Sequence, residues 1–199
     1  YEPALQQFDQ AIRLQPNDPD CWHSRALALC YLNRHREAIP SFNRALELHS
    51  KSFVVWYNRA LALSQLGRHE EAIASYDKTL RLDSTFYQAW FNRGVMLADL
   101  GDYEEALLSF NQTLELEPQF FPAWDARGEV LFDLNRYEEA LANYNQALQI
   151  EPAFPSAWFS RGMVLAKLER HEEAMASFDQ ALSIDPDFSY AWNARGDVL

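Results

Sequence analysis

Hydrophobic and small residues return along this chain at a fixed interval of 34 residues. Each unit has a tryptophan, a small residue four positions later and a leucine seven positions later, and these offsets share one face of an α-helix. The tryptophans are Trp22, Trp56, Trp90, Trp124, Trp158 and Trp192. This period, kept over 199 residues, predicts a stack of similar units rather than one globular core.

A second amphipathic segment follows in each unit. It carries an alanine, an aromatic residue and another small residue, as in Ala38, Phe42 and Ala45. Small residues on both segments let two helix axes approach closely, and the aromatic fills the groove to the neighbouring unit. In four units, a residue suited to ending a helix separates the two segments. These residues are Asn33, Gly67, Gly101 and Asn135, and the exception at the same position is Glu169.

The pattern therefore predicts an all-α chain. The expected helices span residues 3–15, 20–32, 36–49, 54–66, 70–83, 88–100, 104–117, 122–134, 138–151, 156–168 and 172–185, with an incomplete helix over 190–199. We expect each tryptophan to be buried between helices. We expect Pro40 near the first turn of its helix, where a missing N–H costs little.

The order of tryptophan, small residue, Tyr-x-Glu-Ala turn, aromatic residue and proline resembles the tetratricopeptide repeat (TPR), in a bacterial style. The resemblance covers the whole chain and implies a right-handed superhelical solenoid of antiparallel helix pairs, whose first helices line a groove for extended peptides or partner helices. Complete repeats are expected at 19–52, 53–86, 87–120, 121–154 and 155–188. Residues 1–18 match only a second helix, and residues 189–199 match only a first helix. Because the chain starts and stops inside a repeat, we expect it to be a piece of a longer protein.

The composition excludes several partners. A net charge of −12 argues against nucleic acid, whose phosphates require a basic stripe, and against anionic membrane surfaces. No apolar run approaches the roughly 18 residues of a membrane span. Cys21 and Cys30 lie nine residues apart on one expected helix, too far for a disulfide between them. A reducing, cytoplasmic location is therefore the expectation.

No constellation of residues indicates catalysis. His35, His69 and His171 occupy a repeat position that holds tyrosine elsewhere, which indicates packing rather than metal ligation. The glutamate pairs that open the second helices offset the helix dipole. No serine or cysteine stands beside a recognisable base. We expect no enzyme activity, no catalytic residue, no metal and no cofactor.

An arginine stands three residues after every tryptophan, from Arg25 to Arg195. We interpret it as structural, with its aliphatic stem along the core and its guanidinium group on nearby acids, such as those that open the second helix. The alternative is a cationic ladder for an acidic ligand.

The groove-facing positions of the first helices lie one, two, five and eight residues after each tryptophan. They vary between units, whereas the packing residues repeat, and leucine, phenylalanine and valine among them suggest an exposed apolar patch. Two asparagine amides are expected to bond a peptide backbone, and acids that follow favour a basic stretch beside an apolar anchor. The expected peptide-binding residues are Leu27, Tyr57, Asn58, Leu61, Phe91, Asn92, Val95, Asp125 and Glu129.

The leading hypothesis is a protein–protein interaction scaffold that binds an extended peptide or partner helix in its concave groove. One alternative is a self-assembly module, because the two partial repeats at 1–18 and 189–199 are complementary and could dock head to tail. Another is the targeting arm of a larger enzyme, such as a transferase, kinase or protease. The sequence does not identify the partner.

Overall fold

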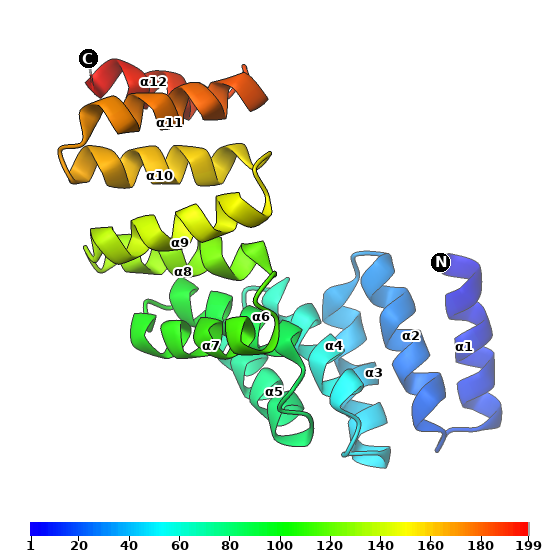
Figure 1. Cartoon of the computed structure of the whole chain (residues 1–199). Helices are drawn as coiled ribbons and strands as arrows, with labels where there is room; N and C mark the ends of the chain where they lie inside the picture. The colour runs from blue at the N-terminus through cyan, green and yellow to red at the C-terminus, as the bar shows by residue number, and fades with distance from the viewer. Residues whose placement is uncertain (199) are drawn as a thin grey trace. The chain divides into compact units, whose positions relative to one another are not determined.

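The computed structural model describes residues 1–198, and these form twelve α-helices without a strand (Figure 1). The all-α prediction is confirmed. The helices are α1 (Glu2–Leu14), α2 (Pro19–Tyr31), α3 (His35–Leu48), α4 (Phe53–Ser64), α5 (His69–Leu82), α6 (Tyr87–Asp99), α7 (Tyr103–Leu116), α8 (Phe121–Asp133), α9 (Tyr137–Ile150), α10 (Pro155–Lys167), α11 (His171–Ile184) and α12 (Ser189–Val198).

Every helix begins one residue earlier than the pattern predicts. The first helices start three residues before their tryptophan, and in α2 and α10 that first residue is a proline. Proline is well suited to this place, because the first N–H groups of a helix have no partner within it. The expectation for residue 199 lies outside the described residues.

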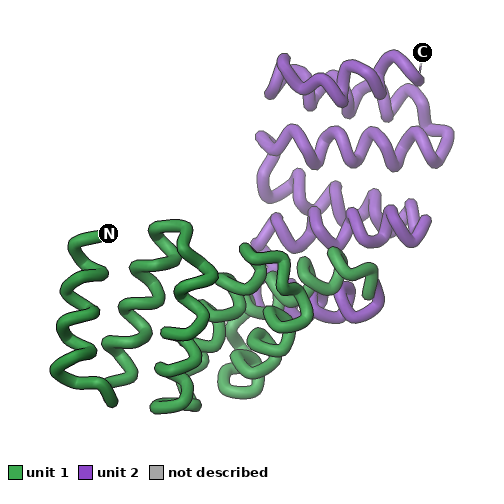
Figure 2. The backbone as a smooth tube through the Cα atoms, turned by 180° about the vertical axis from the view of Figure 1, so that it is seen from behind, with its two compact units in different colours: residues 1–102 green, residues 103–199 purple. Residues whose placement is uncertain are grey.

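The chain divides into two compact units, which are unit 1 (Tyr1–Asp102) and unit 2 (Tyr103–Leu199) (Figure 2). Within unit 1, each of α1 to α5 packs on the helix that follows it. Within unit 2, the same holds for α7 to α11. The first helices α2, α4, α8 and α10 are therefore each covered by the second helix of their own repeat and by the second helix that precedes them.

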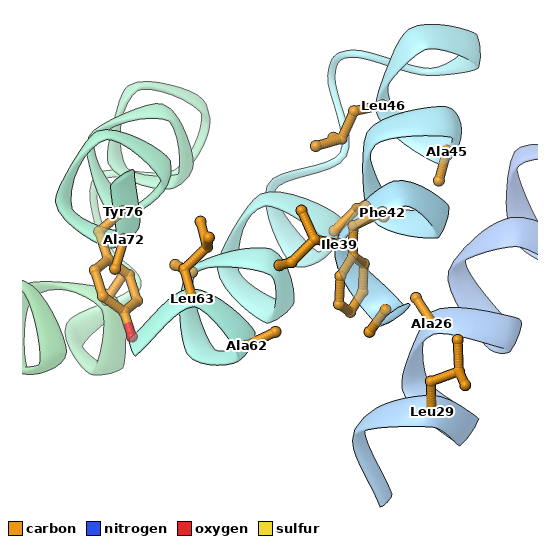
Figure 3. Packing of buried hydrophobic residues seen from close by; sticks show 14 of the residues in the cluster. Ala26, Leu29, Ile39, Phe42, Ala45, Leu46, Ala62, Leu63, Ala72 and Tyr76 are labelled. Carbon is orange, nitrogen blue, oxygen red and sulfur yellow. The ribbon is translucent and has the colours of Figure 1, made fainter. Parts of the chain in front are cut away.

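The aromatic residue of each second helix forms the centre of the packing. Phe42 of α3 and Phe178 of α11 are completely buried, and Tyr76 of α5 is nearly so. In Figure 3, Ile39 and Phe42 lie between Ala26 on one side and Leu63 on the other, so one second helix fills the space beside two first helices. The small residues at these contacts allow the close approach that the sequence predicts.

The tryptophans are less buried than expected. Five of them are half-buried, and Trp192 is 52% exposed. Each indole N–H donates to the backbone carbonyl six residues earlier, for example from Trp22 to Pro16 at 2.8 Å and from Trp124 to Pro118 at 2.9 Å. Because that carbonyl lies in the loop after the preceding helix, the indole must keep its polar edge near the surface. The tryptophan thus ties each first helix to the loop before it.

The turns between the paired helices lie at the residues that the sequence analysis marked as helix ends, and Glu169, its exception, adopts the same conformation as the others. Asn33, Gly67, Gly101, Asn135 and Glu169 all have positive φ, between 58° and 79°. In each turn the following residue donates its N–H to the carbonyl five positions back, as from Arg170 to Leu165 at 2.9 Å. This is the hydrogen-bonding pattern of a Schellman motif, in which glycine and asparagine are favoured because the left-handed conformation strains other residues.

The expectation for Pro40 was wrong. It is the sixth residue of α3, in the second turn rather than the first. At this place a proline has no N–H to donate to the carbonyl of Arg36, so α3 forms one hydrogen bond fewer than an uninterrupted helix.

Candidate functional site

The repeated arginines join helices of neighbouring repeats. Arg25 donates from Nε to Asp9 Oδ1 of α1 at 2.7 Å, and from Nη1 to Ser41 Oγ of α3 at 2.6 Å. The two partners lie sixteen residues before and sixteen residues after the arginine. One side chain of a first helix therefore connects the two second helices that flank it.

This bridge recurs in both units. Arg59 donates to Asn43 and Ser75, and Arg161 donates to Asn145 and Ser177. The bonds satisfy the guanidinium groups and agree with a structural role for these arginines. The sequence analysis expected these arginines to contact the acids that open the second helix. That expectation was wrong, because those acids bond other arginines. They bond the arginine that directly precedes the helix, in the pairs Arg34–Glu37, Arg68–Glu71, Arg136–Glu139 and Arg170–Glu173.

Seven of the nine expected peptide-binding residues belong to unit 1. Leu27 lies on α2, Tyr57, Asn58 and Leu61 lie on α4, and Phe91, Asn92 and Val95 lie on α6. All seven are half-buried, so the expectation of an exposed apolar patch was wrong. Leu27, Leu61 and Val95 pack against the core cluster of unit 1. Neighbouring helices cover both flanks of α2 and α4, and α5 packs on α6, which removes much of this face from solvent.

The polar groups of this face link one repeat to the next. Asn58 Nδ2 lies 3.0 Å from His23 Nε2, and Asn92 Nδ2 donates to the hydroxyl of Tyr57 at 3.1 Å. An amide nitrogen can only donate, so Nε2 of His23 accepts and the imidazole is neutral with its proton on Nδ1. Burial lowers the pKa of His23, which agrees with this state.

Each of these bonds joins residues 35 positions apart, from two after one tryptophan to one after the previous tryptophan. The sequence analysis placed both positions on the groove face but did not pair them. Only the stagger between adjacent first helices shows which positions meet.

The remaining two expected residues, Asp125 and Glu129, lie on α8 in unit 2. Among the described residues, the buried Oδ1 of Asp125 has no hydrogen-bond partner. Burial, and to a lesser extent the charge of Glu129, raises the pKa of Asp125 to about 6. The residue 35 positions later, Ser160, hydrogen bonds Tyr144. In unit 1, side chains 35 positions apart hydrogen bond each other at this place. Asp125 Oδ1 makes no such bond with Ser160.

A pocket of about 240 Å³ lies between α8, α9 and α10 in unit 2. The sequence analysis placed several of its residues on the groove face without assigning them to the site. Its lining residues are Glu129, Phe132, Asp133, Tyr144, Phe159, Ser160 and Met163.

The histidines and cysteines occupy packing positions. His69 Nδ1 lies 3.2 Å from Met96 Sδ and 3.7 Å from a carboxylate oxygen of Asp99. Cys21 and Cys30 are both free, and burial raises the pKa of Cys30 to about 11. Within residues 1–198, no cluster of histidine, cysteine and acidic side chains could hold a metal ion. No helix over the same residues combines the length and the apolar character needed to span a bilayer.

Three family models match the chain. Two described as tetratricopeptide repeat match residues 23–85 and 57–119, and residues 155–188, while a third described as TPR repeat matches residues 128–169. Together with the helix pairs and their turns, these matches show that the chain belongs to the TPR family and is an array of such repeats. A search of curated proteins gave no match.

Solved structures share the fold. The TPR protein YrrB, described as having an unusual peptide-binding site, is 24% identical, with a TM-score of 0.83 over 97% of this chain and 100% of its own. MamA from Desulfovibrio magneticus RS-1 is 16% identical, with a TM-score of 0.81 over 85% of this chain and 96% of its own. The C-terminal part of a TPR protein from Cytophaga hutchinsonii is 15% identical, with a TM-score of 0.80 over 92% of this chain and 74% of its own.

Proposed function

We propose that this TPR array is a protein-interaction scaffold that binds an extended peptide or a partner helix along its first helices. Positions that join the helices carry the same residue types in every repeat, as the arginine bridges illustrate. Positions one, two and five residues after each tryptophan differ between repeats. A binding surface on a common scaffold has this combination of constant and variable positions.

The observation that carries the proposal is the unused hydrogen-bonding capacity of the variable face. Asn58 and Asn92 each use one N–H for a contact within the chain. The other N–H and the carbonyl oxygen of each amide bond no described residue. A side-chain amide with one donor and one acceptor to spare can pair with one peptide unit of an extended backbone.

The chemistry of the partner follows from the charges. The chain carries a net charge of −12, and Asp125 and Glu129 add acids to the variable face of unit 2. We infer a partner segment that combines apolar side chains with a basic stretch. The peptide-binding site named for YrrB, a protein of the same fold, supports a peptide as the type of ligand.

Selection from a random peptide library displayed on phage, with the whole chain immobilised, tests the proposal. We expect enriched peptides to combine apolar residues with lysine or arginine. The double variant Asn58→Ala, Asn92→Ala should bind an enriched peptide at least about thirtyfold more weakly by calorimetry, because each amide loses at least one hydrogen bond of about 1 kcal/mol to the peptide.

The matched control removes two amides from another face. Gln146 and Gln149 on α9 are also polar amides, and Gln146 is exposed. Gln146→Ala with Gln149→Ala should leave the affinity unchanged. The proposal fails if no peptide is enriched, or if the Asn58 and Asn92 variant keeps full affinity.

Self-association end to end is a second candidate. It is favoured by the exposure of Tyr190 and Trp192 on α12, at 69% and 52%, and of Leu14 on α1, at 73%. Sedimentation velocity over a range of concentrations separates it from peptide binding. A concentration-dependent increase in mass that Trp192→Ala abolishes would support it, and a constant monomer would reject it.

A further inference from the structure

The pocket between α8, α9 and α10 combines apolar walls with an acidic rim. Phe132 of α8 and Phe159 and Met163 of α10 are half-buried and supply the apolar surface. Tyr144 of α9 is only 3% exposed and forms the buried end. This arrangement can bury an alkyl chain while its end reaches acidic groups.

The acidic rim comes from one stripe of α8. Glu129 and Asp133 line the pocket and are exposed, and they lie one helical turn apart. Asp125 lies one turn before Glu129 on the same stripe. After burial, the charges of Asp125, Glu129 and Asp133 all raise the pKa of Tyr144. The negative charges of three carboxylates are therefore felt at Tyr144, the buried end of this one pocket.

No basic residue lines this pocket. The arginine of α8, Arg127, is held elsewhere, where it donates to Asn143 at 2.7 Å and to Asn111 at 2.6 Å. Those partners belong to a different hollow, which also contains Arg136 and Glu139. The pocket thus combines negative charge with apolar walls, and its natural complement is a positive charge on an apolar stem.

We propose that the pocket formed by α8, α9 and α10 receives one lysine or arginine side chain of a bound polypeptide. The alkyl stem lies against Phe132, Phe159 and Met163, and the charged head lies between Glu129 and Asp133. Long basic side chains bury their stems on apolar surfaces in this way, and their charge is also attracted to aromatic faces. This inference rests on the proposed function, because it names the side chain that the scaffold recognises in unit 2.

The size of the pocket favours a single side chain over a whole small molecule. Its volume of about 240 Å³ lies below the roughly 300–1,000 Å³ of most small-molecule sites. A purely apolar side chain would displace water from the acidic rim without any compensating charge, and an acidic side chain would be repelled. Asp125 lies one turn before Glu129, and its buried Oδ1 has no partner among the described residues, so a cation held at Glu129 would offset part of its desolvation.

Methionine methyl groups provide a direct readout of this pocket. The chain has three methionines, of which Met163 lines the pocket while Met96 and Met175 lie elsewhere. The whole chain, labelled with ¹³C-methyl methionine, is titrated with N-acetyl-lysine methylamide and N-acetyl-arginine methylamide. We expect a saturable shift of the Met163 resonance, and no shift of Met96 or Met175.

Two comparisons test the charge. N-acetyl-norleucine methylamide has the same four-carbon stem without the ammonium group and should not reproduce the shift. Glu129→Gln with Asp133→Asn should weaken lysine binding about tenfold or more. Glu138→Gln with Glu172→Gln, at two exposed glutamates of α9 and α11, removes the same net charge and should leave it unchanged.

Three results would overturn the inference: no saturable Met163 shift, an equal shift with norleucine, or an equal loss in the Glu138 and Glu172 control. The amino-acid probes report on the pocket alone. If library peptides bind but the lysine probe does not, only the pocket assignment fails. If the lysine probe binds but no peptide is enriched, the proposed scaffold function fails instead.

Discussion

Units 1 and 2 share one scaffold but differ on the same face of their first helices. In unit 1 the residues just after the tryptophans bond one another, in the pairs His23–Asn58 and Tyr57–Asn92. In unit 2 this row contains Asp125, whose buried oxygen has no partner among the described residues, and the neighbouring surface is hollowed. The comparison shows that a repeat can change the chemistry of its variable face while it keeps the arginine bridges between its helices.

Individual repeats also differ in how the paired helices meet. Four residues after the tryptophan, α2 and α4 of unit 1 have alanine, whereas α6 of unit 1 and the first helices of unit 2 have glycine. The alanines are Ala26 and Ala60, and the glycines are Gly94, Gly128, Gly162 and Gly196. A Cβ atom on Gly162 would lie only 2.5 Å from a ring carbon of Phe178, which is completely buried. At Gly162 the aromatic ring therefore occupies space that an alanine methyl group would need, whereas α2 and α4 accommodate Ala26 and Ala60 at the same repeat position.

Gly162→Ala gives the largest effect expected from this difference. The added methyl group collides with a ring that has no room to move, and overpacking of this kind typically costs about 1–3 kcal/mol. That cost exceeds the gain of up to about 1 kcal/mol from replacing glycine in a helix. We expect a net loss of about 1–2 kcal/mol in the free energy of unfolding of unit 2, measured by urea denaturation.

Gly196→Ala is the control, because a Cβ at Gly196 meets nothing within 4 Å. It should be neutral or slightly stabilising. An unchanged stability in Gly162→Ala would show that the pair α10–α11 has room for an alanine, as the pairs α2–α3 and α4–α5 do.

Asp125→Asn sharpens the comparison of the variable faces. Because the pKa of Asp125 is raised to about 6 in the folded chain, ionisation at pH 7 opposes folding. We expect the amide to stabilise unit 2 by on the order of 1–2 kcal/mol at pH 7. The gain should disappear below about pH 4, where the carboxyl group is protonated in both the folded and the unfolded chain.

The two units should respond to mild acid in opposite directions. As the pH falls from 7 toward 5, Asp125 takes up a proton more readily when folded, so unit 2 becomes more stable. The pKa of His23 is lowered by folding, so the unfolded chain binds protons first and unit 1 becomes less stable. Native-state hydrogen exchange in α2–α4 and in α8–α10, corrected for intrinsic rates, measures each response. Parallel changes in both units would contradict this account.

The turns give the smallest effect. Unit 1 uses Asn33, Gly67 and Gly101 at the left-handed position, whereas unit 2 includes Glu169 with a φ of 60°. Glu169→Gly removes the strain of a side chain in this conformation and should raise the melting temperature, with a gain of up to about 1 kcal/mol. A loss of stability would show that the glutamate side chain makes a compensating contact.

The helix pairs, their turns and the structural arginines could be predicted because they repeat. Six copies of one pattern average out the ambiguity of any single segment, and helix ends were expected at Asn33 and Gly67 from residue type alone. Every helix start was expected one residue too late, and each first helix begins three residues before its tryptophan rather than two.

The features that escaped prediction depend on the distance between non-identical side chains. Whether Leu61 is exposed depends on how closely flanking helices approach, and the pairing of Asn58 with His23 depends on the stagger of two first helices. Asp125 Oδ1 has no partner among the described residues, and Ser160, at the position that would pair with it, hydrogen bonds Tyr144. The periodic pattern does not record such contacts, because they depend on which residues the variable positions carry.

The central claim is that the variable face of the first helices binds the partner, and one matched comparison tests it. Leu27→Ala with Leu61→Ala alters this face, whereas Leu82→Ala with Leu108→Ala removes the same atoms from exposed sites on second helices. The quantity measured is the affinity of a library-selected peptide for each folded variant. We expect the Leu27 and Leu61 variant to bind at least about tenfold more weakly, because two apolar contacts are lost. The Leu82 and Leu108 variant should bind as the unaltered chain does. Equal affinity in both variants, or a loss confined to the Leu82 and Leu108 variant, would contradict the account.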